Sequence, residues 1–144
     1  MNLLKIASVP PPTASPEASV LEAVNLMHDQ RVGAVAVTVN RILAGIFTER
    51  DLMIRVVLAG NNPKTTKLHE VMTAECVCAK EEMSLGEALH IMTEKNFRHL
   101  PLVNNNNEVL GLLSIRNLLH QRVDTLSDEL ESLVSFFTAD GIGG

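Results

Sequence analysis

Apolar residues in the first half of the chain change from a helical to a strand spacing. Ser19-Val20-Leu21-Glu22 has the form of a capping box, and the apolar residues after it follow helical intervals, which predicts a helix of roughly ten residues. Residues 32–39 are almost all valine and alanine, which predicts a strand buried on both faces. Residues 42–47 predict its hairpin partner, and a second helix is expected over residues 50–58. The proline run at residues 10–12 must be extended and forms an entry strand or linker.

The same order begins again in the second half. Ser84-Leu85-Gly86-Glu87 repeats the capping box at a shift of 65 residues, and residues 97–103 match the buried strand. A short strand is expected over residues 75–79, in the place of the proline run. One added residue in the turn at 104–107 changes the shift to 66, and turns tolerate such insertions. This period is too long for a solenoid repeat and indicates tandem duplication of a βαββα unit.

Composition and charge restrict the classes of partner. Apolar residues make up 46% of the 144 residues, but Trp and Tyr are absent and Phe occurs four times, so we expect an aliphatic core filled with methionine. The net charge is −5 and the basic residues are scattered, which argues against nucleic-acid binding but still allows a small anion. No apolar run approaches the length of a membrane span or a signal-peptide core. We therefore expect a soluble, cytoplasmic protein with no membrane partner.

A short motif recurs in both halves, as Gly45-Ile46-Phe47-Thr48-Glu49-Arg50-Asp51 and as Gly111-Leu112-Leu113-Ser114-Ile115-Arg116-Asn117. Its hydroxyl could simply cap a helix, but capping explains neither the repeated arginine nor the repeated glycine. The same geometry fits a nucleotide. A helix N-terminus attracts phosphate, the arginine neutralises charge, and a carboxylate one turn into the helix can accept both hydroxyls of a ribose.

Duplicated βαββα units that end in this motif resemble the cystathionine-β-synthase domain, which occurs in tandem pairs. The resemblance covers residues 6–123 and is carried jointly by Val71-Met72-Thr73, Leu100-Pro101-Leu102-Val103 and the stretch from Gly45 to Asp51. It implies a sensory module with two clefts for adenosine-containing ligands such as AMP, ADP, ATP, NAD(H) or S-adenosylmethionine, with no required cofactor. It also implies an α+β fold with two motifs packed in pseudo-twofold symmetry, followed by a C-terminal helix. The expected boundaries are 1–66 for the first motif, 67–123 for the second, and 124–144 for the C-terminal helix and flexible glycine tail.

Carried over position by position, the resemblance implies a set of ligand contacts. In the first half, Asp51 would hold the ribose hydroxyls, while Thr48 and Arg50 would meet phosphate. In the second half, the phosphate role passes to Ser114, Arg116, Arg98 and His99. Backbone groups expected to read the edge of the adenine lie near Gly33, Val35 and Val77.

Two positions depart from the family pattern. Asn117 stands where the family has an aspartate, and an amide lacks the charge that strengthens hydrogen bonds to ribose. Gly33 stands where the second half has Arg98, so the first cleft has lost a base. We therefore predict unequal sites, with Asp51 anchoring ribose in one cleft and the basic side chains of the second half favouring phosphate in the other. His99 could instead be an interior histidine that is hydrogen-bonded to backbone.

The sequence offers no positive sign of catalysis or metal binding. Cys76 and Cys78 are too close for an unstrained disulfide, which fits reduced thiols, and with one distant histidine they make a poor zinc set. Thr48 has no placed general base, and no carboxylate pair is specific enough to nominate. We therefore do not expect an enzyme.

The C-terminal segment carries a heptad-like apolar seam. The seam residues are Leu119, Val123, Leu126, Leu130, Leu133 and Phe137. They either pack on their own unit or form a dimer seam, and the flat dimers common in this family favour a homodimer. With no catalytic or DNA-binding domain attached, the module is expected to regulate an unidentified protein or to report through its own assembly. The competing hypothesis is a purely structural dimerisation module with empty, degenerate clefts.

Overall fold

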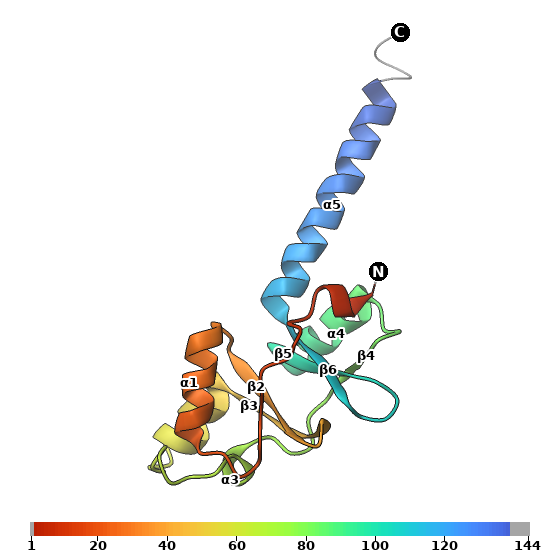
Figure 1. Ribbon diagram of the computed structural model, residues 1–144. Coiled ribbons are helices and arrows are strands. Elements are labelled where there is room, and N and C mark those ends of the chain that lie inside the picture. The colour runs from red at the N-terminus through yellow and green to blue at the C-terminus, as the bar shows by residue number, and fades with distance from the viewer. Residues whose placement is uncertain (1, 139–144) are drawn as a thin grey trace.

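A computed structural model describes residues 2–138 and contains two βαββα units that lie side by side (Figure 1). Each unit has a three-stranded sheet in which the first strand runs parallel to the second and the second antiparallel to the third. This arrangement confirms the α+β fold class, while the predicted glycine tail at 141–144 lies outside the described residues. In chain order the elements are the 3-10 turn η1 (Leu3–Lys5), β1 (Thr13–Ala14), α1 (Val20–Gln30), β2 (Ala34–Val39), β3 (Ile42–Thr48), α2 (Glu49–Asp51), η2 (Leu52–Val57), α3 (Leu68–Val71), β4 (Ala79–Lys80), α4 (Leu85–Lys95), β5 (His99–Val103), β6 (Val109–Ser114) and α5 (Ile115–Phe137).

The two predicted capping boxes open α1 and α4. At α1, the Ser19 hydroxyl accepts from the backbone N–H of Glu22 at 3.1 Å, and the Glu22 carboxylate accepts from the N–H of Ser19 at 3.1 Å. At α4, the Ser84 hydroxyl accepts from the N–H of Glu87 at 3.0 Å, and within the described chain the reciprocal bond is not formed. The second box is therefore only half of what the sequence predicts.

Two predicted elements differ from those in the structure. The expected helix over residues 50–58 is present, but η2 is π-helical, and the N–H of Leu58 donates to the carbonyl of Met53, five residues back. The strand predicted over residues 75–79 is wrong in extent, because the observed β4 has two residues and shares only Ala79 with that range. In the first unit the N–H of Ala36 donates to the carbonyl of Pro12, but the equivalent position in the second unit is Pro101, which has no N–H to donate. The segment before β4 therefore stays out of the sheet and is free to line a cavity.

The segment that leads into each unit packs against the other unit. Leu3 of η1 is fully buried in the core of the second unit, whereas Leu68 of α3 is fully buried in the core of the first. Ser8 forms a backbone bridge to β6, and Thr73 forms the corresponding bridge to β3. This reciprocal exchange ties the two units together with pseudo-twofold symmetry.

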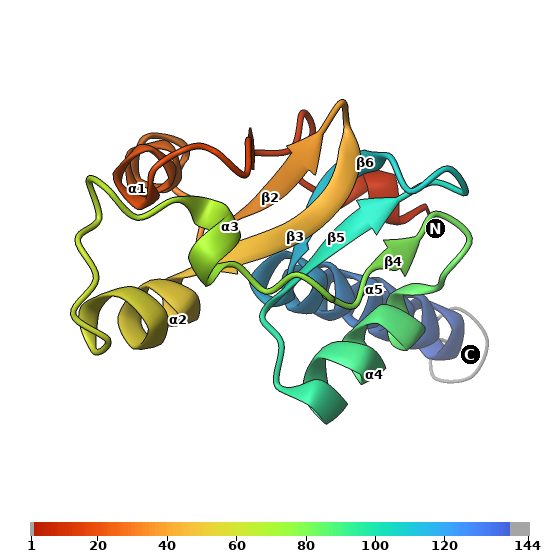
Figure 2. The same ribbon diagram turned by 90° about the horizontal axis from the view of Figure 1, so that it is seen from below.

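Between the two sheets lies a small apolar cluster of Ala34, Ile46 and Leu112. Figure 2 shows the sheets between α1 and α2 on one side and α4 and α5 on the other. Each sheet is covered by helices on one face and by the other sheet on the opposite face. This explains why nearly all residues of β2 and β5 are apolar and buried.

Helix α5 leaves the body of the protein soon after it begins (Figure 1). Leu118 is its one buried residue, and the later apolar side chains are exposed. The interpretation in which this segment packs on its own unit is therefore not the arrangement observed. Despite its length, α5 is too polar to cross a bilayer, and no other helix of the described chain meets that requirement.

Candidate functional site

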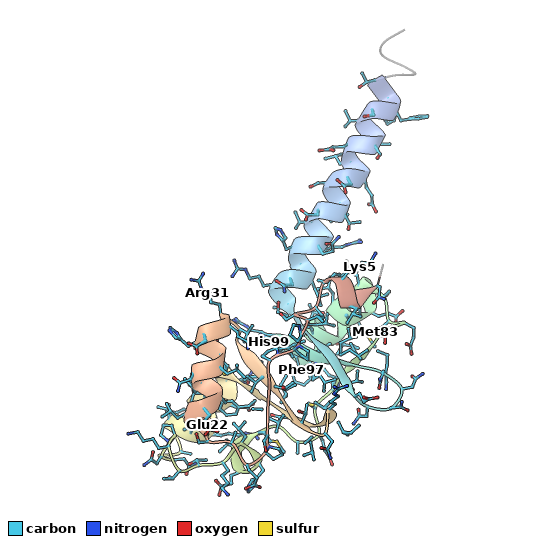
Figure 3. The ribbon with its side chains drawn as sticks, viewed as in Figure 1. Lys5, Glu22, Arg31, Met83, Phe97 and His99 are labelled. Atoms are coloured by element: carbon cyan, nitrogen blue, oxygen red, sulfur yellow. The ribbon has the colours of Figure 1, made fainter. Side chains whose placement is uncertain are left out.

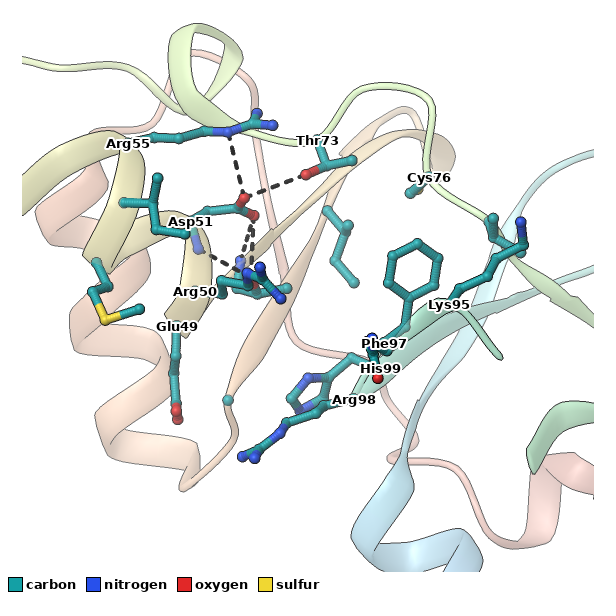
Figure 4. A pocket seen from close by; sticks show the side chains of 17 residues that line it. Glu49, Arg50, Asp51, Arg55, Thr73, Cys76, Lys95, Phe97, Arg98 and His99 are labelled. Carbon is teal, nitrogen blue, oxygen red and sulfur yellow. Dashed lines mark hydrogen bonds and ion pairs between the residues drawn. The ribbon is translucent and has the colours of Figure 1, made fainter. Parts of the chain in front are cut away.

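A cavity of about 1000 Å³ lies between the two units beside the first copy of the motif, and we call it the first pocket (Figure 4). The end of β3 and α2 form one wall, while the segment before β4 and the start of β5 form the others. Predicted ligand residues that line it are Gly33, Thr48, Arg50, Asp51, Val77, Arg98 and His99.

Asp51 is the buried anion of the first pocket, with 7% of its surface exposed. Its Oδ2 accepts from the backbone N–H of Thr48 at 3.0 Å and from the Thr48 hydroxyl at 3.2 Å, while the Asp51 N–H donates back to that hydroxyl. Its Oδ1 accepts from the Thr73 hydroxyl at 3.3 Å and lies 3.7 Å from Nε of Arg55. The capping box thus occupies one carboxylate oxygen, and only longer contacts hold the other.

Basic and aromatic side chains lie across the first pocket from Asp51. Figure 4 shows Phe97, Arg98 and His99 at the start of β5, facing the motif across the cavity, with Lys95 beside them. Burial lowers the pKa of the His99 imidazole below its ordinary value, and the neighbouring Arg98 lowers it further. The neutral form of His99 is therefore favoured at pH 7 in the free protein.

Gly33 makes room for the His99 ring. A Cβ placed at Gly33 would lie 2.9 Å from Cε1 of His99 and 3.0 Å from Oε1 of Glu49. From the sequence alone, this glycine is interpreted as a lost base. The structure gives it a steric role instead, because a side chain here would displace the imidazole from the pocket wall.

A second cavity, of about 1270 Å³, lies between the end of α1 and the beginning of α5, and we call it the second pocket. Two carboxylates, Asp29 and Glu49, line it, but cations outnumber them. Figure 3 places Arg31 at the end of α1 that is nearer to α5. The basic side chains of the second pocket are Arg31, Arg98, Arg116, His28, His99 and His120.

The second copy of the motif lines the second pocket and differs from the first in its acceptor. The Ser114 hydroxyl accepts from the N–H of Asn117 at 3.1 Å, which caps α5 as Thr48 caps α2. Asn117 is exposed, however, and it presents an amide where Asp51 presents a buried carboxylate. The two pockets therefore differ in their acceptor, which is a buried carboxylate in the first and an exposed amide in the second, while several cations line both.

The two pockets share a wall. Gly33, Glu49, Arg98 and His99 line both cavities, whereas the sequence predicts Arg98 and His99 for the second cleft alone. The carbonyl of Arg98 also accepts from the N–H of Ile115, the first residue of α5, at 2.8 Å. A charge bound on either side of this wall is therefore close to both pockets and to the start of α5.

Val35 itself lines neither pocket, because its side chain is fully buried in the first core and its backbone pairs with β3. The expected adenine contact from backbone groups near it stays a prediction. Arg55 and Thr73, which hold Asp51, were not predicted, although Arg55 lies one helical turn after Asp51 and Thr73 belongs to the Val-Met-Thr motif. Arg31 carries no sequence signal of its own, since only the fold brings it beside α5.

Cys76 also lines the first pocket, on the segment that stays out of the sheet. Burial, with a smaller contribution from Cys78, raises the pKa of its thiol to about 11. The thiol is therefore protonated at neutral pH and is a poor nucleophile. Among residues 2–138, no group of three or more His, Cys, Asp and Glu side chains is arranged to hold a metal ion.

Comparison with known sequences identifies the repeated unit. The family described as CBS domain matches residues 5–58 and 68–124. The uncharacterized protein MK0525 of Methanopyrus kandleri is 30% identical over 83% of this chain, and the chain spans 63% of that protein. An inosine-5'-monophosphate dehydrogenase of Methanocaldococcus jannaschii is 35% identical over 76% of this chain, which spans only 21% of the enzyme. The CBS domain-containing protein YhcV of Bacillus subtilis is 34% identical, with coverage of 81% of this chain and 80% of the relative.

Solved structures share the same architecture. A protein with CBS domains from Burkholderia ambifaria superposes with a TM-score of 0.77 at 31% identity, over 86% of this chain and 95% of that protein. The CBS domain pair of protein MJ0100, solved in complex with 5'-methylthioadenosine and S-adenosyl-L-methionine, superposes with a TM-score of 0.76 at 21% identity, over 87% of this chain and 98% of that one. At 21% identity, the similarity to MJ0100 shows a shared fold and nothing more.

Proposed function

Because the chain belongs to the CBS domain family, we propose that it is a regulatory module that binds an adenosine-containing nucleotide in the first pocket and reports its occupancy to a partner protein or through its own assembly. The observation that carries this proposal is the Asp51 carboxylate. It is buried, it lines a cavity of nucleotide size, and one of its oxygens has only long contacts.

The ribose binds at Oδ1 of Asp51. A carboxylate oxygen has two lone pairs, and at Oδ1 these are used by the Thr73 hydroxyl at 3.3 Å and by Arg55 at 3.7 Å. Ribose hydroxyls can replace or share these long contacts without breaking the capping box at Oδ2. Thr73 and Arg55 remain nearby to keep the charge of Asp51 balanced.

The phosphate end points to the shared wall, where Arg98 and His99 can bind it, and Lys95 of the first pocket adds positive charge beside them. The apolar side chains of Ile46, Met53, Ile54 and Val77 line the same cavity and suit the faces of an adenine ring. The ligands of MJ0100 are themselves adenosine derivatives, and because this chain shares the fold of MJ0100, they support the same class of ligand here. The second pocket, with Arg31, Arg98 and Arg116, is the companion site for a phosphate-rich ligand.

Occupancy is transmitted through two backbone connections. Thr73, which contacts Asp51, lies on the segment that the second unit lends to the sheet of the first. The backbone carbonyl of Arg98, in the shared wall, accepts a hydrogen bond from the N–H of Ile115, the first residue of α5. A ligand can shift α5 between two conformations only if it binds the corresponding two conformations of the shared wall with different free energies.

Self-association through α5 is the second part of the proposal. The apolar seam of α5 is exposed along its length, and an unpartnered face of this kind marks a protein interface. We therefore propose a homodimer.

The competing function is a structural dimerisation module that binds no nucleotide. The internal hydrogen bonds of Asp51 favour it, because they already satisfy this carboxylate in the free protein. The exposed seam of α5 is equally compatible with it.

Thermal-shift measurements with AMP, ADP, ATP, NADH and S-adenosylmethionine separate the two functions. A ligand present at a hundred times its Kd should stabilise the protein by about 2.7 kcal/mol, which corresponds to a rise of roughly 5–10 °C in Tm. The sensory function predicts this rise for at least one of the five ligands. No shift with any of them would favour the structural module.

Nucleotide affinity should rise as the pH falls from 8 to 6. In the free protein the pKa of His99 is depressed, so the ring is neutral at pH 7, and a phosphate bound beside it favours the protonated form. Binding therefore takes up a proton, and by linkage the affinity is highest where that proton is available, below the ordinary pKa of about 6.5. Calorimetry at several pH values should show this slope in the parent protein and a flatter one in His99→Gln.

His90→Gln is the matched control for this measurement, because His90 is exposed on α4 and lines neither pocket. Comparison between the variants cancels the titration of the nucleotide phosphate itself. An unchanged slope in His99→Gln would remove His99 from the phosphate site.

A further inference from the structure

Helix α1 ends in a left-handed turn at an arginine. Arg31 has a φ of 55° and a ψ of 46°, and the N–H of the next residue, Val32, donates to the carbonyl of Met27 at 3.0 Å. This closing bond requires a positive φ at residue 31. Glycine adopts such a φ freely and asparagine with little strain, whereas other side chains are disfavoured there. Arginine therefore lowers the stability of this helix ending.

The second unit ends its equivalent helix in the same way but with a different residue. Asn96, at the repeat shift of 65 residues from Arg31, has a φ of 57° at the end of α4. The N–H of Phe97 donates to the carbonyl of Met92, again at 3.0 Å. Asparagine is one of the residues that this conformation accepts best. The helix ending does not need an arginine, so the reason for Arg31 has to lie in its side chain.

The Arg31 side chain is not used by the protein itself. It is exposed at the end of α1 that is nearer to α5 (Figure 3). Within residues 2–138, the one arginine whose side chain bonds to other protein groups is Arg55. The guanidinium of Arg31 therefore keeps its five donors for a ligand.

Three arginines from separate elements line the second pocket. Arg31 follows α1, Arg98 precedes β5, and Arg116 lies in the first turn of α5. Asp29 and Glu49 line the same cavity, but in the described part of the chain neither forms an ion pair with an arginine. A planar guanidinium fits two oxygens of a phosphate group at once. The cavity is thus suited to an anion that offers several phosphate oxygens.

We propose that Arg31 is a phosphate-binding residue of the second pocket, and that the chain keeps it in the left-handed turn for this contact although it lowers stability. This inference rests on the companion site of the proposed function and not on nucleotide binding in the first pocket. The ligand class is an anion with at least two phosphate groups, because three guanidinium groups from three elements can each bind oxygens of it. Affinity and stability are therefore opposed at one residue.

Arg31→Gly should bind inorganic pyrophosphate about tenfold more weakly than the parent protein, while its Tm rises by roughly 2–5 °C. The substitution removes the guanidinium and relieves the left-handed backbone in one change. Pyrophosphate carries two phosphate groups and no adenosine, so its titration succeeds or fails independently of nucleotide binding in the first pocket. Calorimetry at low salt measures the affinity, and thermal unfolding without ligand measures the Tm.

Arg41→Gly is the matched control. Arg41 has a φ of 72° in the turn between β2 and β3, and it lines neither pocket. Its replacement removes the same charge and relieves the same backbone conformation, and the resulting Asn-Gly sequence is the one that such turns favour. The Tm should therefore rise as in Arg31→Gly, whereas the affinity for pyrophosphate should stay within about twofold of the parent protein.

Two further variants identify the binding group and locate the probe. Arg31→Lys keeps the charge and the backbone conformation, so the Tm should be parental and the affinity should fall only about threefold through loss of the guanidinium fork. Arg116→Gln should weaken binding about tenfold, because Arg116 lines the second pocket and not the first.

Equal affinities in Arg31→Gly and Arg41→Gly would remove Arg31 from the site and overturn the proposal. A parent protein that does not bind pyrophosphate, or parental affinity in Arg116→Gln, would overturn it as well. A fall in the Tm of Arg31→Gly would show that this arginine supports the fold, which contradicts the proposed opposition between stability and binding.

Discussion

Asp51→Asn should weaken the binding of an adenine nucleotide roughly thirty- to hundredfold. Hydrogen bonds to a charged acceptor stabilise by about 1.5–3 kcal/mol and those to a neutral one by about 0.5–1.5, so two ribose hydroxyls together lose about 2–3 kcal/mol. The substitution keeps the shape of the side chain and one acceptor oxygen for the capping bond from the Thr48 N–H. Isothermal calorimetry with the best ligand from the thermal-shift series measures the loss directly.

Asn117→Ala is the matched control, because Asn117 occupies the equivalent position of the second motif but does not line the first pocket. Its effect on binding to the first pocket should stay within about threefold, since the change lies outside that cavity and removes no charge. Parental affinity in Asp51→Asn would show that Asp51 serves only the capping box. A larger loss in Asn117→Ala would place the ribose in the second pocket instead.

Gly45→Ala should destabilise the fold by about 1–3 kcal/mol, because overpacking a close contact forces the backbone apart. A Cβ at Gly45 would lie 2.7 Å from the carbonyl oxygen of Thr73 and 2.8 Å from Sδ of Met72. The backbone of Thr73 cannot retreat easily, since it is bonded in both directions to Ile46 at 3.0 and 2.9 Å. Thermal unfolding should show a fall in Tm of roughly 3–10 °C.

The control for this substitution is Gly86→Ala in the first turn of α4, where a Cβ would meet only Oγ of Ser84 at 3.9 Å. Alanine there is expected to be neutral or to stabilise by about 0.5–1 kcal/mol through helix propensity. If Gly45→Ala unfolded at the same temperature as the parent protein, the close approach of Thr73 would not be the reason for the glycine.

Because Thr73 also contacts Asp51, the same variant should bind nucleotide more weakly.

The glycine of the motif illustrates how far sequence reasoning reached. At the level of the sequence, its presence in both copies favours a ligand site, because capping does not explain it. The structure gives a packing reason, since Gly45 admits the lead-in segment at Thr73 and Gly111 admits the corresponding segment at Ser8, whose carbonyl oxygen would lie 3.2 Å from a Cβ. The exchange of these segments involves residues about 28 and 103 positions away in the chain, and no local pattern reveals a contact of that range.

The shared wall illustrates the same limit within the site. The sequence predicts Arg98 and His99, two basic residues beside a central strand, for one cleft, whereas they line both. The family resemblance implies adenine contacts from backbone groups near Val35, and the side chain of Val35 lies in the core. A strand places successive side chains on opposite faces, so the side that meets a cavity depends on which helix covers each face.

The sequence by itself determined the duplication, the capped helices, the buried strands and the family, because these rest on short-range periodicity, on turn and cap chemistry, and on motifs that are read locally. Only the tertiary structure decided which residues share a cavity, why the motif needs its glycine, and that α5 leaves the body with its apolar seam exposed. Those features depend on contacts between segments far apart in the chain, whose geometry is set by the packing of the two units against each other.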